Sequence, residues 1–297
     1  MAFGLAAPTI TRGRWFFKLD CRGRRWFGGE DIGNRRATDG LAIWEGSVSI
    51  LLNPVTAPDD SKISLSVFFP CYNEEANVVR TTEEALKACR QYCSDFEIII
   101  VNDGSKDRTA ERADELAAKY EEVSAVHNNP NLGYGGALQR GFAESTKEWI
   151  FYTDGDGQFD FQEIGKLIPL LGDCDIVSAY RLDRKDSALR KLNGWCWTTL
   201  VNIVFGLWLK DIDCAFKIFP RRLFEQIELH SMGALIDTEI LAKAKYLGYR
   251  IAQIGVHHYA RTAGEQTGAN LGVILRAFKE LFQLRSHIRK TVKLNKP

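Results

Sequence analysis

The sequence predicts an α/β fold, in which a mostly parallel sheet carries helices on both of its faces. Short apolar runs of strand length alternate with segments whose apolar residues recur at helical spacing. Several of the apolar runs end in loops rich in Asp, Asn and Gly. Ligands bind beside such loops in open sheets, so the same loops are the first candidates for a functional site.

The first expected strand begins at Ser64, where an apolar run continues until Pro70 stops it. Asn73 is then expected to cap the first helix, with Glu74 and Glu75 in its first turn. The alternation of types favours parallel strands joined by helices. The later expected strands cover residues 96–101, 123–127 and 149–152, and the later expected helices cover residues 109–120 and 138–145.

The composition excludes several classes of protein. The chain has 297 residues, of which 45% are hydrophobic, and its net charge of +1 gives no indication of a nucleic-acid partner. Seven cysteines occur without a CxxC pair, so we expect neither a disulfide framework nor a zinc site, and we expect a reducing, cytoplasmic compartment. No signal peptide is visible, and no apolar stretch reaches the roughly 18–20 residues that cross a bilayer.

Composition also divides the chain into three parts. Residues 1–62 are rich in Gly and Arg with interleaved aromatic residues, and they are expected to form a poorly ordered extension. A membrane-surface or RNA contact is the alternative for this extension. Residues 63–284 are expected to be the α/β domain, and residues 285–297 a basic tail.

The segment 191–209 is apolar, contains three tryptophans and has basic residues on both sides. This composition is typical of a helix that lies in a membrane interface. An ordinary buried core helix fits the composition equally well, so both interpretations stay open.

The strongest local signal is Asp154-Gly155-Asp156-Gly157-Gln158, directly after an expected strand. Two carboxylates one residue apart can share a hard cation, and Mg²⁺ and Mn²⁺ prefer oxygen ligands while keeping positions open for phosphate. A diphosphate leaving group needs such neutralisation when its bond to a sugar breaks. Asp and Gly also favour turns, so the motif by itself is compatible with an ordinary loop.

Asp103 ends the second expected strand and can accept hydrogen bonds from a nucleobase or ribose. The alternative is an aspartate that stabilises a turn or caps a helix. The run 131–136 is rich in glycine but matches neither the dinucleotide nor the phosphate-loop pattern, so we expect a turn that opens a helix.

Taken together, these motifs resemble family 2 glycosyltransferases. They are Pro70-Cys71-Tyr72-Asn73-Glu74, Asn102-Asp103-Gly104-Ser105 and Asp154-Gly155-Asp156-Gly157-Gln158. The later segments look like those of the dolichyl-phosphate mannosyltransferase and polyprenyl-phosphate glycosyltransferase group: Ala179-Tyr180-Arg181, Asp213-Cys214-Ala215-Phe216-Lys217, Asp237-Thr238-Glu239, and His258-Tyr259 followed by Arg261. The resemblance covers about residues 64–284. It implies the GT-A fold and the transfer, with inversion, of a hexose from a nucleotide-sugar donor.

The resemblance also implies roles for the matching positions. The metal, Mg²⁺ or Mn²⁺, would be held by Asp154, Asp156 and Gln158. Asp156 and Arg181 would be catalytic, and Arg181 and Arg190 would contact the acceptor phosphate. The donor would contact residues of the early motifs and of the late loop: Pro70, Tyr72, Glu74, Val101, Asp103, Asp154, Gly155, Asp156 and Arg261.

The acceptor decides whether a general base is needed. A polyprenyl or dolichyl phosphate is already anionic, and the enzyme would then work peripherally at the cytoplasmic face of a membrane. A carbohydrate or small-molecule hydroxyl requires a base, and Asp237 is the candidate. A nucleotide-binding regulatory protein without turnover is a different class of function, against which the intact Asp154 and Asp156 argue.

Two departures from the group's pattern affect what the resemblance implies. Ala215 stands where glycine is common, and the run 264–268 lacks the basic residue that some members have near Thr267. GDP-mannose and UDP-glucose are both compatible donors, and the sequence does not indicate an oligomeric state.

Overall fold

A computed structural model describes residues 15–19, 25–29, 62–182, 188–233, 235–260 and 280–288. The chain divides into two compact units, Met1–Thr56 and Ala57–Pro297. In the first unit, strands β1 (Trp15–Leu19) and β2 (Arg25–Gly29) pair in antiparallel orientation. The other residues of the expected extension before Lys62 lie outside the described ranges, so their disorder stays a prediction.

The second unit is built on a seven-stranded sheet with the order β5-β4-β3-β6-β8-β7-β9. Neighbouring strands are parallel, except that β8 runs antiparallel to both β6 and β7. The prediction of a mostly parallel sheet is therefore confirmed. The strands are β3 (Ile63–Cys71), β4 (Cys93–Asn102), β5 (Val123–His127), β6 (Trp149–Thr153), β7 (Ile176–Leu182), β8 (Phe216–Pro220) and β9 (Ile251–His257).

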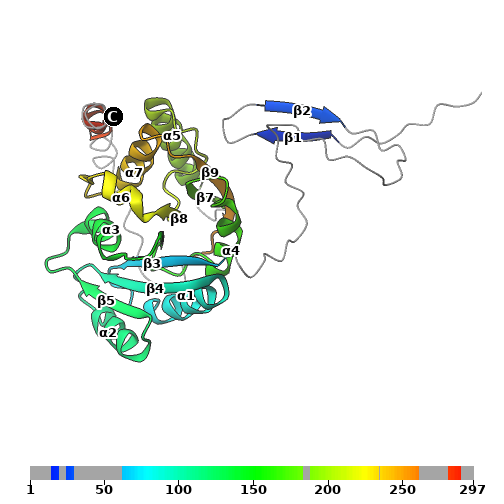
Figure 1. Ribbon diagram of the computed structural model, residues 1–297. Helices are drawn as coiled ribbons and strands as arrows, with labels where there is room; N and C mark the ends of the chain where they lie inside the picture. The colour runs from blue at the N-terminus through cyan, green and yellow to red at the C-terminus, as the bar shows by residue number, and fades with distance from the viewer. Residues whose placement is uncertain are drawn as a thin grey trace, which may run out of the picture. The chain divides into compact units, whose positions relative to one another are not determined.

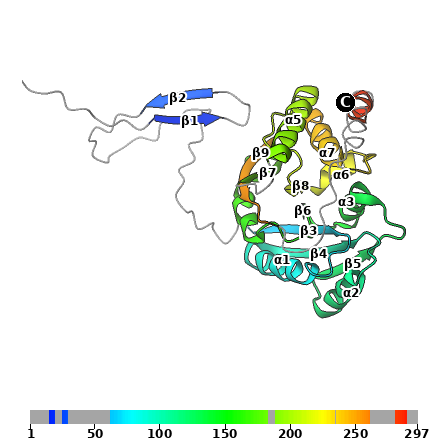
Figure 2. The same cartoon turned by 180° about the vertical axis from the view of Figure 1, so that it is seen from behind.

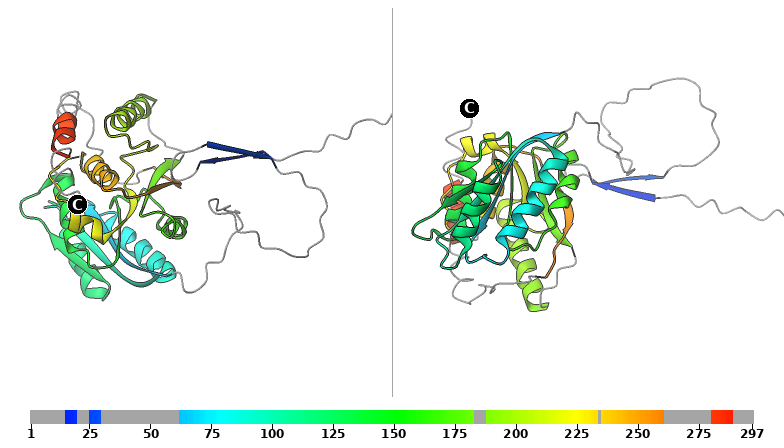
Figure 3. Two further views of the ribbon diagram at one scale, coloured as in Figure 1. Left: turned by 45° about the horizontal axis from the view of Figure 1, so that its top comes forward. Right: turned by 90° about the horizontal axis from the view of Figure 1, so that it is seen from below.

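Helices cover both faces of the sheet, as the sequence predicts. Figures 1 and 2 show α1 and α2 on one side of β3, β4 and β5, and α3 on the other. In the right-hand view of Figure 3, α5 projects from the body of this unit. The helices are α1 (Val78–Tyr92), α2 (Thr109–Lys119), α3 (Gly133–Glu144), α4 (Ile164–Leu167), α5 (Ala188–Phe205), α6 (Arg221–Gln226) and α7 (Leu235–Tyr246), together with residues 280–288 and 3₁₀ turns at Phe161–Glu163 and Ile168–Leu170.

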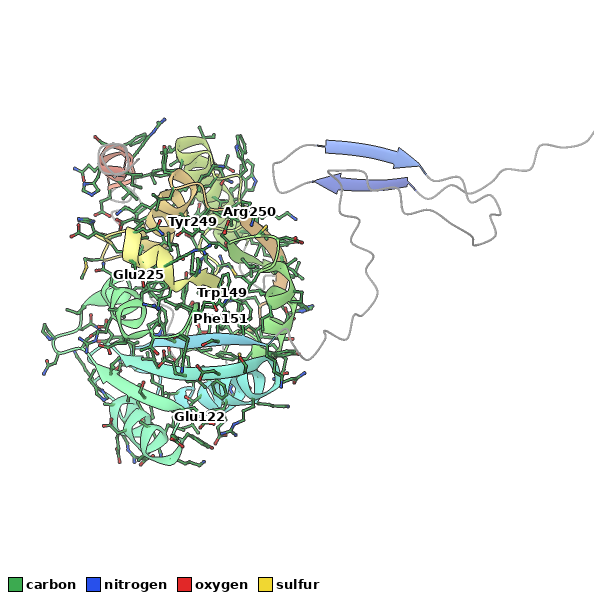
Figure 4. The ribbon with its side chains drawn as sticks, viewed as in Figure 1. Glu122, Trp149, Phe151, Glu225, Tyr249 and Arg250 are labelled. Carbon is green, nitrogen blue, oxygen red and sulfur yellow. The ribbon has the colours of Figure 1, made fainter. Side chains whose placement is uncertain are left out.

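The core follows the middle strands of the sheet. Figure 4 labels Trp149 and Phe151 on β6, and the ring of Phe151 lies 4.6 Å from that of Phe216 and 6.1 Å from that of Phe161. Because both faces of these strands are covered, they read in the sequence as continuous apolar runs rather than as alternating ones.

The first helix starts later than predicted. Asn73 does not cap it, because α1 begins at Val78, so Glu74 and Glu75 precede the helix. Asn73 instead has a positive φ of 57°, which a short polar side chain tolerates. Its Oδ1 accepts a hydrogen bond from the backbone N of Lys106 at 2.8 Å, so Asn73 fastens the loop after β3 to the loop after β4.

The Trp-rich segment is buried in part, as a core helix would be, and exposed in part, and its contact with a membrane stays a prediction. Val201, Val204 and Phe205 of α5 are buried, whereas Trp195 is 66% exposed and Trp208, in the loop after the helix, is 74% exposed. In the described part of the chain, no helix combines the length and the apolar character that crossing a bilayer requires.

Candidate functional site

The predicted site residues gather at one edge of the sheet. Asp103 and Asp154 directly follow β4 and β6, which both run parallel to β3, and Arg181 lies near the end of β7. Because β8 is antiparallel, its first residue, Phe216, pairs with Thr153 at the end of β6. The loop that precedes β8 therefore joins this edge between the ends of β6 and β7.

The loop after β6 turns tightly against the end of β3. A Cβ on Gly155 would lie 2.6 Å from the Cys71 sulfur and 2.7 Å from the Pro70 carbonyl oxygen, so only glycine fits here. The Asp156 Oδ1 accepts a hydrogen bond from the backbone N of Gln158 at 3.1 Å, which stabilises the turn. This packing holds the two carboxylates of the loop at the sheet edge.

Asp154 is surrounded by groups that oppose its ionisation. Burial raises its pKa from 3.8 to about 7, and the neighbouring carboxylates of Asp156 and Asp237 act in the same direction. The Tyr134 hydroxyl donates a hydrogen bond to the Asp154 Oδ1 at 3.1 Å, and this bond and the charge of Arg181 lower the pKa in part. A bound cation would relieve the repulsion between these carboxylates.

The chemistry of the two carboxylates fits Mg²⁺ or Mn²⁺, which prefer oxygen ligands. Within the described ranges, no group of three or more His, Cys, Asp or Glu side chains is arranged to hold a metal ion. Two carboxylates such as Asp154 and Asp156 suit a cation that takes its other ligands from water and phosphate oxygens. Gln158 donates through Nε2 to the Tyr259 carbonyl oxygen at 2.8 Å, which leaves its Oε1 as the amide atom for a cation.

Asp211 holds Arg181 in one orientation. The Arg181 Nε donates to Asp211 Oδ2 at 2.7 Å, and Nη2 donates to Oδ1 at 2.8 Å. Burial lowers the pKa of the Arg181 guanidinium, but the hydrogen bonds and charge of Asp211 outweigh it, so the pKa is raised overall. The bidentate pair fixes the plane of the guanidinium, in which Nη1 also lies.

Asp237, the candidate base, is engaged in a buried network. The Lys217 Nζ donates to Asp237 Oδ1 at 2.7 Å, to the Tyr152 hydroxyl at 3.0 Å and to the Cys214 carbonyl oxygen at 2.5 Å. The Tyr152 hydroxyl also donates to Asp237 Oδ1. Because one oxygen of Asp237 already accepts from two donors, a role as base would depend on the other oxygen.

Asp213 lies in the loop before β8. Among the described residues, its buried Oδ1 has no hydrogen-bond partner. Burial, together with the charges of Asp237 and Asp211, raises the pKa of Asp213 from 3.8 to about 6, although the charges of Arg181 and Lys217 lower it in part. An ionised carboxylate in this position lowers the stability of the folded protein.

Asp103 caps α3. Its Oδ1 accepts from the Asn128 Nδ2 and from the backbone N of Leu132, both at 2.9 Å, and its Oδ2 accepts from the backbone N of Gly133 at 2.9 Å. The helix therefore begins at Gly133, earlier than the sequence predicts. The carboxylate has a structural task, and its contact with a donor nucleotide stays a prediction.

The profile of the family described as "Glycosyl transferase family 2" matches residues 66–228, which is more than half of the chain. The chain belongs to glycosyl transferase family 2. It is accordingly a glycosyltransferase of EC class 2.4.

This family 2 glycosyltransferase is similar to several curated relatives. It is 32% identical over 205 residues to glycosyltransferase AglD of Haloferax volcanii, covering 65% of this chain and 33% of the relative. It is 32% identical over 209 residues to an undecaprenyl-phosphate 4-deoxy-4-formamido-L-arabinose transferase of Pectobacterium carotovorum, covering 69% and 62%. It is 29% identical over 226 residues to dolichyl-phosphate beta-glucosyltransferase of Saccharomyces cerevisiae, covering 67% of each. The chain thus spans only part of the length of these relatives.

Solved structures confirm the predicted GT-A fold. The glucosyl-3-phosphoglycerate synthase from Mycobacterium tuberculosis, in complex with Mn²⁺ and UDP-glucose, matches with a TM-score of 0.58 at 20% identity, covering 75% of this chain and 79% of that one. The mannosyl-3-phosphoglycerate synthase from Rubrobacter xylanophilus matches with a TM-score of 0.58 at 17% identity, covering 79% and 76%.

The predicted donor-binding residues of β3 and β4 lie near one another. Pro70 pairs with Val101 across the two strands, and Tyr72 is exposed just beyond them. Glu74 is buried, and its Oε2 accepts a hydrogen bond from the Asn77 Nδ2 at 2.7 Å. Val101 has no exposed surface, so its side chain packs in the core, and its contact with the donor stays a prediction.

Two predicted phosphate contacts cannot be placed in this site. Arg261 lies outside the described residues, and so does the side chain of Arg190, whose backbone belongs to α5. Their roles stay predictions.

Some side chains that shape the site have no role in the sequence analysis: Tyr134, Asp211 and Lys217. A signal for Tyr134 was present, because a helix that follows a parallel strand begins at the edge where ligands bind. Lys217 is part of a motif that resembles the family's, but the motif does not predict which carboxylate Lys217 pairs with.

Proposed function

We propose that this chain is an inverting, metal-dependent glycosyltransferase that moves a hexose from a donor of the GDP-mannose or UDP-glucose type to a polyprenyl or dolichyl phosphate at the cytoplasmic face of a membrane. The proposal is carried by the placement of Asp154 and Asp156 after β6 and of Arg181 near the end of β7, on either side of the start of β8. The carboxylates of Asp154 and Asp156 can bind a cation that neutralises the donor diphosphate. The guanidinium of Arg181 can bind the phosphate of the acceptor. Relatives named for transfer to undecaprenyl and dolichyl phosphate support this acceptor.

Asp154 and Asp156 would hold the cation, with the Gln158 Oε1 as a further ligand. When bound, such a cation neutralises the negative charge that builds on the diphosphate as the sugar leaves. The Tyr134 hydroxyl keeps the Asp154 carboxylate oriented through its hydrogen bond. The complex of glucosyl-3-phosphoglycerate synthase with Mn²⁺ and UDP-glucose supports Mn²⁺ as the ion to test first.

Arg181 would bind the acceptor phosphate. Asp211 holds its guanidinium rigidly, and a planar, pre-oriented guanidinium matches the geometry of phosphate oxygens. A phosphate oxygen is anionic near neutral pH, so its attack on the sugar needs no general base. Attack from the side opposite the leaving diphosphate inverts the anomeric carbon.

The alternative is a soluble glycosyltransferase that acts on a carbohydrate or small-molecule hydroxyl, with Asp237 as the base. Asp237 is buried, and its Oδ1 is already held by Lys217 and Tyr152, so only its other oxygen could accept the proton of a hydroxyl acceptor. The phosphate acceptor is therefore the better fit to this site.

An exposed apolar surface supports work at a membrane. The apolar residues that α5 contributes to this surface recur at helical spacing, and basic residues flank them. Lysines at such a position are worth about 1 kcal/mol each against anionic headgroups. This α5 surface consists of Leu192, Trp195, Ile203 and Trp208, flanked by exposed Lys191 and Lys210.

Trp208 is braced in its exposed position. Its φ of 60° is rare and strained for a bulky residue. Asn202 donates to the Leu209 carbonyl oxygen at 2.7 Å and accepts from the Leu209 N at 2.9 Å, and the Gln253 Nε2 donates to the Trp208 carbonyl oxygen at 3.3 Å. A strained tryptophan that the fold holds outward favours a docking function.

Donor turnover with and without lipid acceptor tests the proposal. The full chain is given UDP-glucose or GDP-mannose with Mn²⁺, and release of the nucleoside diphosphate is measured with polyprenyl phosphate present or absent. We expect turnover that depends on polyprenyl phosphate and falls strongly in Arg181→Lys, while Arg90→Lys on the exposed side of α1 serves as the control. Faster transfer to a soluble hydroxyl acceptor would favour the alternative, and no release from either donor would contradict the proposal.

Liposome flotation tests the membrane surface. The protein should float with anionic liposomes at low salt and less at high salt, because the lysines act through screened charges. Trp208→Ser should reduce flotation, whereas Val79→Ser, an exposed apolar position on α1, should not. Flotation that is unaffected by Trp208→Ser would remove the α5 surface from the proposal.

A further inference from the structure

The topology places Asp213 between the two groups to which the proposed function assigns phosphates. The strand order β6-β8-β7 puts the start of β8 between the loop that contains Asp154 and the strand end that contains Arg181. Asp213 lies in the loop that precedes β8, three residues before Phe216, and this loop enters between the two. When a sugar passes directly from one phosphate to another, it lies between them.

The electrostatic contacts of Asp213 reach both sides of this loop. The charge of Asp213 contributes to the raised pKa of Tyr134, whose hydroxyl donates to Asp154. On the other side, the charge of Arg181 lowers the pKa of Asp213. Asp213 is therefore near both the donor half and the acceptor half of the site.

Asp213 differs from the other carboxylates of the loop and of α7 in its partners. Asp211 accepts from Arg181, and Asp237 accepts from Lys217, both within 2.7–2.8 Å. The Oδ1 of Asp213 is buried and has no partner among the described residues. Buried carboxylate oxygens are normally hydrogen-bonded, and a group that weakens the free protein in this way is typical of a binding site.

We propose that Asp213 accepts hydrogen bonds from hydroxyl groups of the sugar that is transferred, and that it thereby selects the sugar; this inference rests on the proposed function. Hydroxyl groups are the hydrogen-bond donors that a hexose presents between two phosphates. A carboxylate can accept from two adjacent hydroxyls at once, so it distinguishes sugars in which one of them points the other way.

The experiment compares wild-type protein with Asp213→Asn and with Asp173→Asn, an exposed aspartate in the turn before β7. Calorimetry measures the binding of UDP and GDP with Mn²⁺, which carry no sugar. Steady-state assays with polyprenyl phosphate measure kcat/KM for UDP-glucose, UDP-galactose and GDP-mannose. Thermal unfolding at about pH 8 reports whether each variant is folded.

We expect Asp213→Asn to keep its affinity for the nucleoside diphosphates within about threefold. Its kcat/KM for the preferred donor should fall by on the order of 100-fold, because the carboxylate is built to meet a hydroxyl. The ratio of kcat/KM between UDP-glucose and UDP-galactose should move toward one, and Asp173→Asn should behave like the wild type.

An unchanged ratio between the two UDP-sugars would overturn the inference. A loss of UDP affinity as large as the loss of kcat/KM would also overturn it, because Asp213 would then act on the metal or the nucleotide. A variant less stable than the wild type would assign Asp213 a structural task instead. Failure of the proposed function looks different: wild-type protein would then turn over none of the donors, or would prefer a soluble hydroxyl acceptor.

Discussion

Lys217 and Asp237 form an ion pair in which Nζ lies 2.7 Å from Oδ1 and the two side chains are 0% and 4% exposed. Lys217 pairs across the sheet with Tyr152, two residues before Asp154, so the ion pair lies close to the loop that follows β6. A buried charge without its partner is costly, and this cost makes the pair testable.

Lys217→Met should lower the free energy of unfolding by about 3–5 kcal/mol, because it leaves the carboxylate of Asp237 buried without a cation. The double variant Lys217→Met/Asp237→Leu should recover most of this loss, since it removes both charges. Urea unfolding at neutral pH measures both values. Equal losses in the single and the double variant would show that the charge of Asp237 is not the cause.

Gly155→Ala should displace the loop after β6, because its new Cβ would lie 2.6 Å from the Cys71 sulfur. We expect a loss of about 1–3 kcal/mol of stability and weaker binding of Mn²⁺ with UDP. Gly172→Ala is the matched control, since a Cβ there meets nothing within 4 Å. Calorimetric titration and thermal unfolding of both variants check the prediction, which fails if the two variants behave alike.

The affinity for Mn²⁺ should rise with pH. The pKa of Asp154 is raised to about 7, so below that pH a cation must displace a proton from this carboxylate. We expect an increase of up to about tenfold per pH unit between about pH 5.5 and 7, and a smaller one above it. Asp154→Asn should abolish the pH dependence together with most of the affinity, while the exposed Asp95→Asn should leave both unchanged. A flat titration of the wild type would contradict the raised pKa.

Asp213→Asn should stabilise the metal-free protein at alkaline pH. The pKa of Asp213 is raised from 3.8 to about 6, so the folded state holds this proton more tightly than the unfolded state. Ionised Asp213 therefore destabilises the fold fully above about pH 6, and the effect disappears as the pH falls below about 4. The gain at about pH 8 should be at most about 3 kcal/mol. Denaturant unfolding at several pH values measures it, and a gain that is constant with pH would point to another cause.

Asp103→Ala should affect both stability and donor binding. Removing the carboxylate leaves the backbone N of Leu132 and of Gly133 without their cap, which costs about 1–2 kcal/mol. If Asp103 also contacts the donor, the apparent KM should rise by about one to two orders of magnitude. Kinetics at a temperature well below the unfolding transition separate the two effects. A stability loss with an unchanged KM would leave Asp103 with the capping task alone.

Four of the seven strands of the large sheet, β3 to β6, could be predicted, because their apolar runs indicate burial directly, whereas β7, β8 and β9 were not predicted. The strand at 123–127 has the bounds that the sequence suggests, and β6 differs only by the addition of Thr153. The starts of α1 and α3 could not be predicted, since they depend on contacts between residues that are far apart in the chain. Asn73 bonds to the loop after β4, and Asp103 bonds to the start of α3. The reversed direction of β8 likewise depends on pairing with distant strands.

The motifs of the site could be predicted from the sequence, but the hydrogen-bond and ion-pair partners of its side chains could not. The motif at Asp154 and Asp156 and the position of Arg181 follow from the sequence. The partner of Arg181, Asp211, lies 30 residues away and has no motif of its own. The ion pair of Asp237 could not be predicted from its sequence neighbours either, because its partner Lys217 lies on another element.

The reversed strand β8 has a consequence for how this enzyme could change its specificity. A sheet edge made only by parallel strands is lined by loops that follow strands, whereas here one loop that precedes a strand enters it. That loop, residues 206–215, contains the braced Trp208, the partner of Arg181 and the buried carboxylate of Asp213. Membrane contact, acceptor phosphate and sugar would thus be encoded in one short, exchangeable stretch of sequence. Transplanting this stretch from a relative should alter all three properties together while the nucleotide half of the enzyme remains as it is.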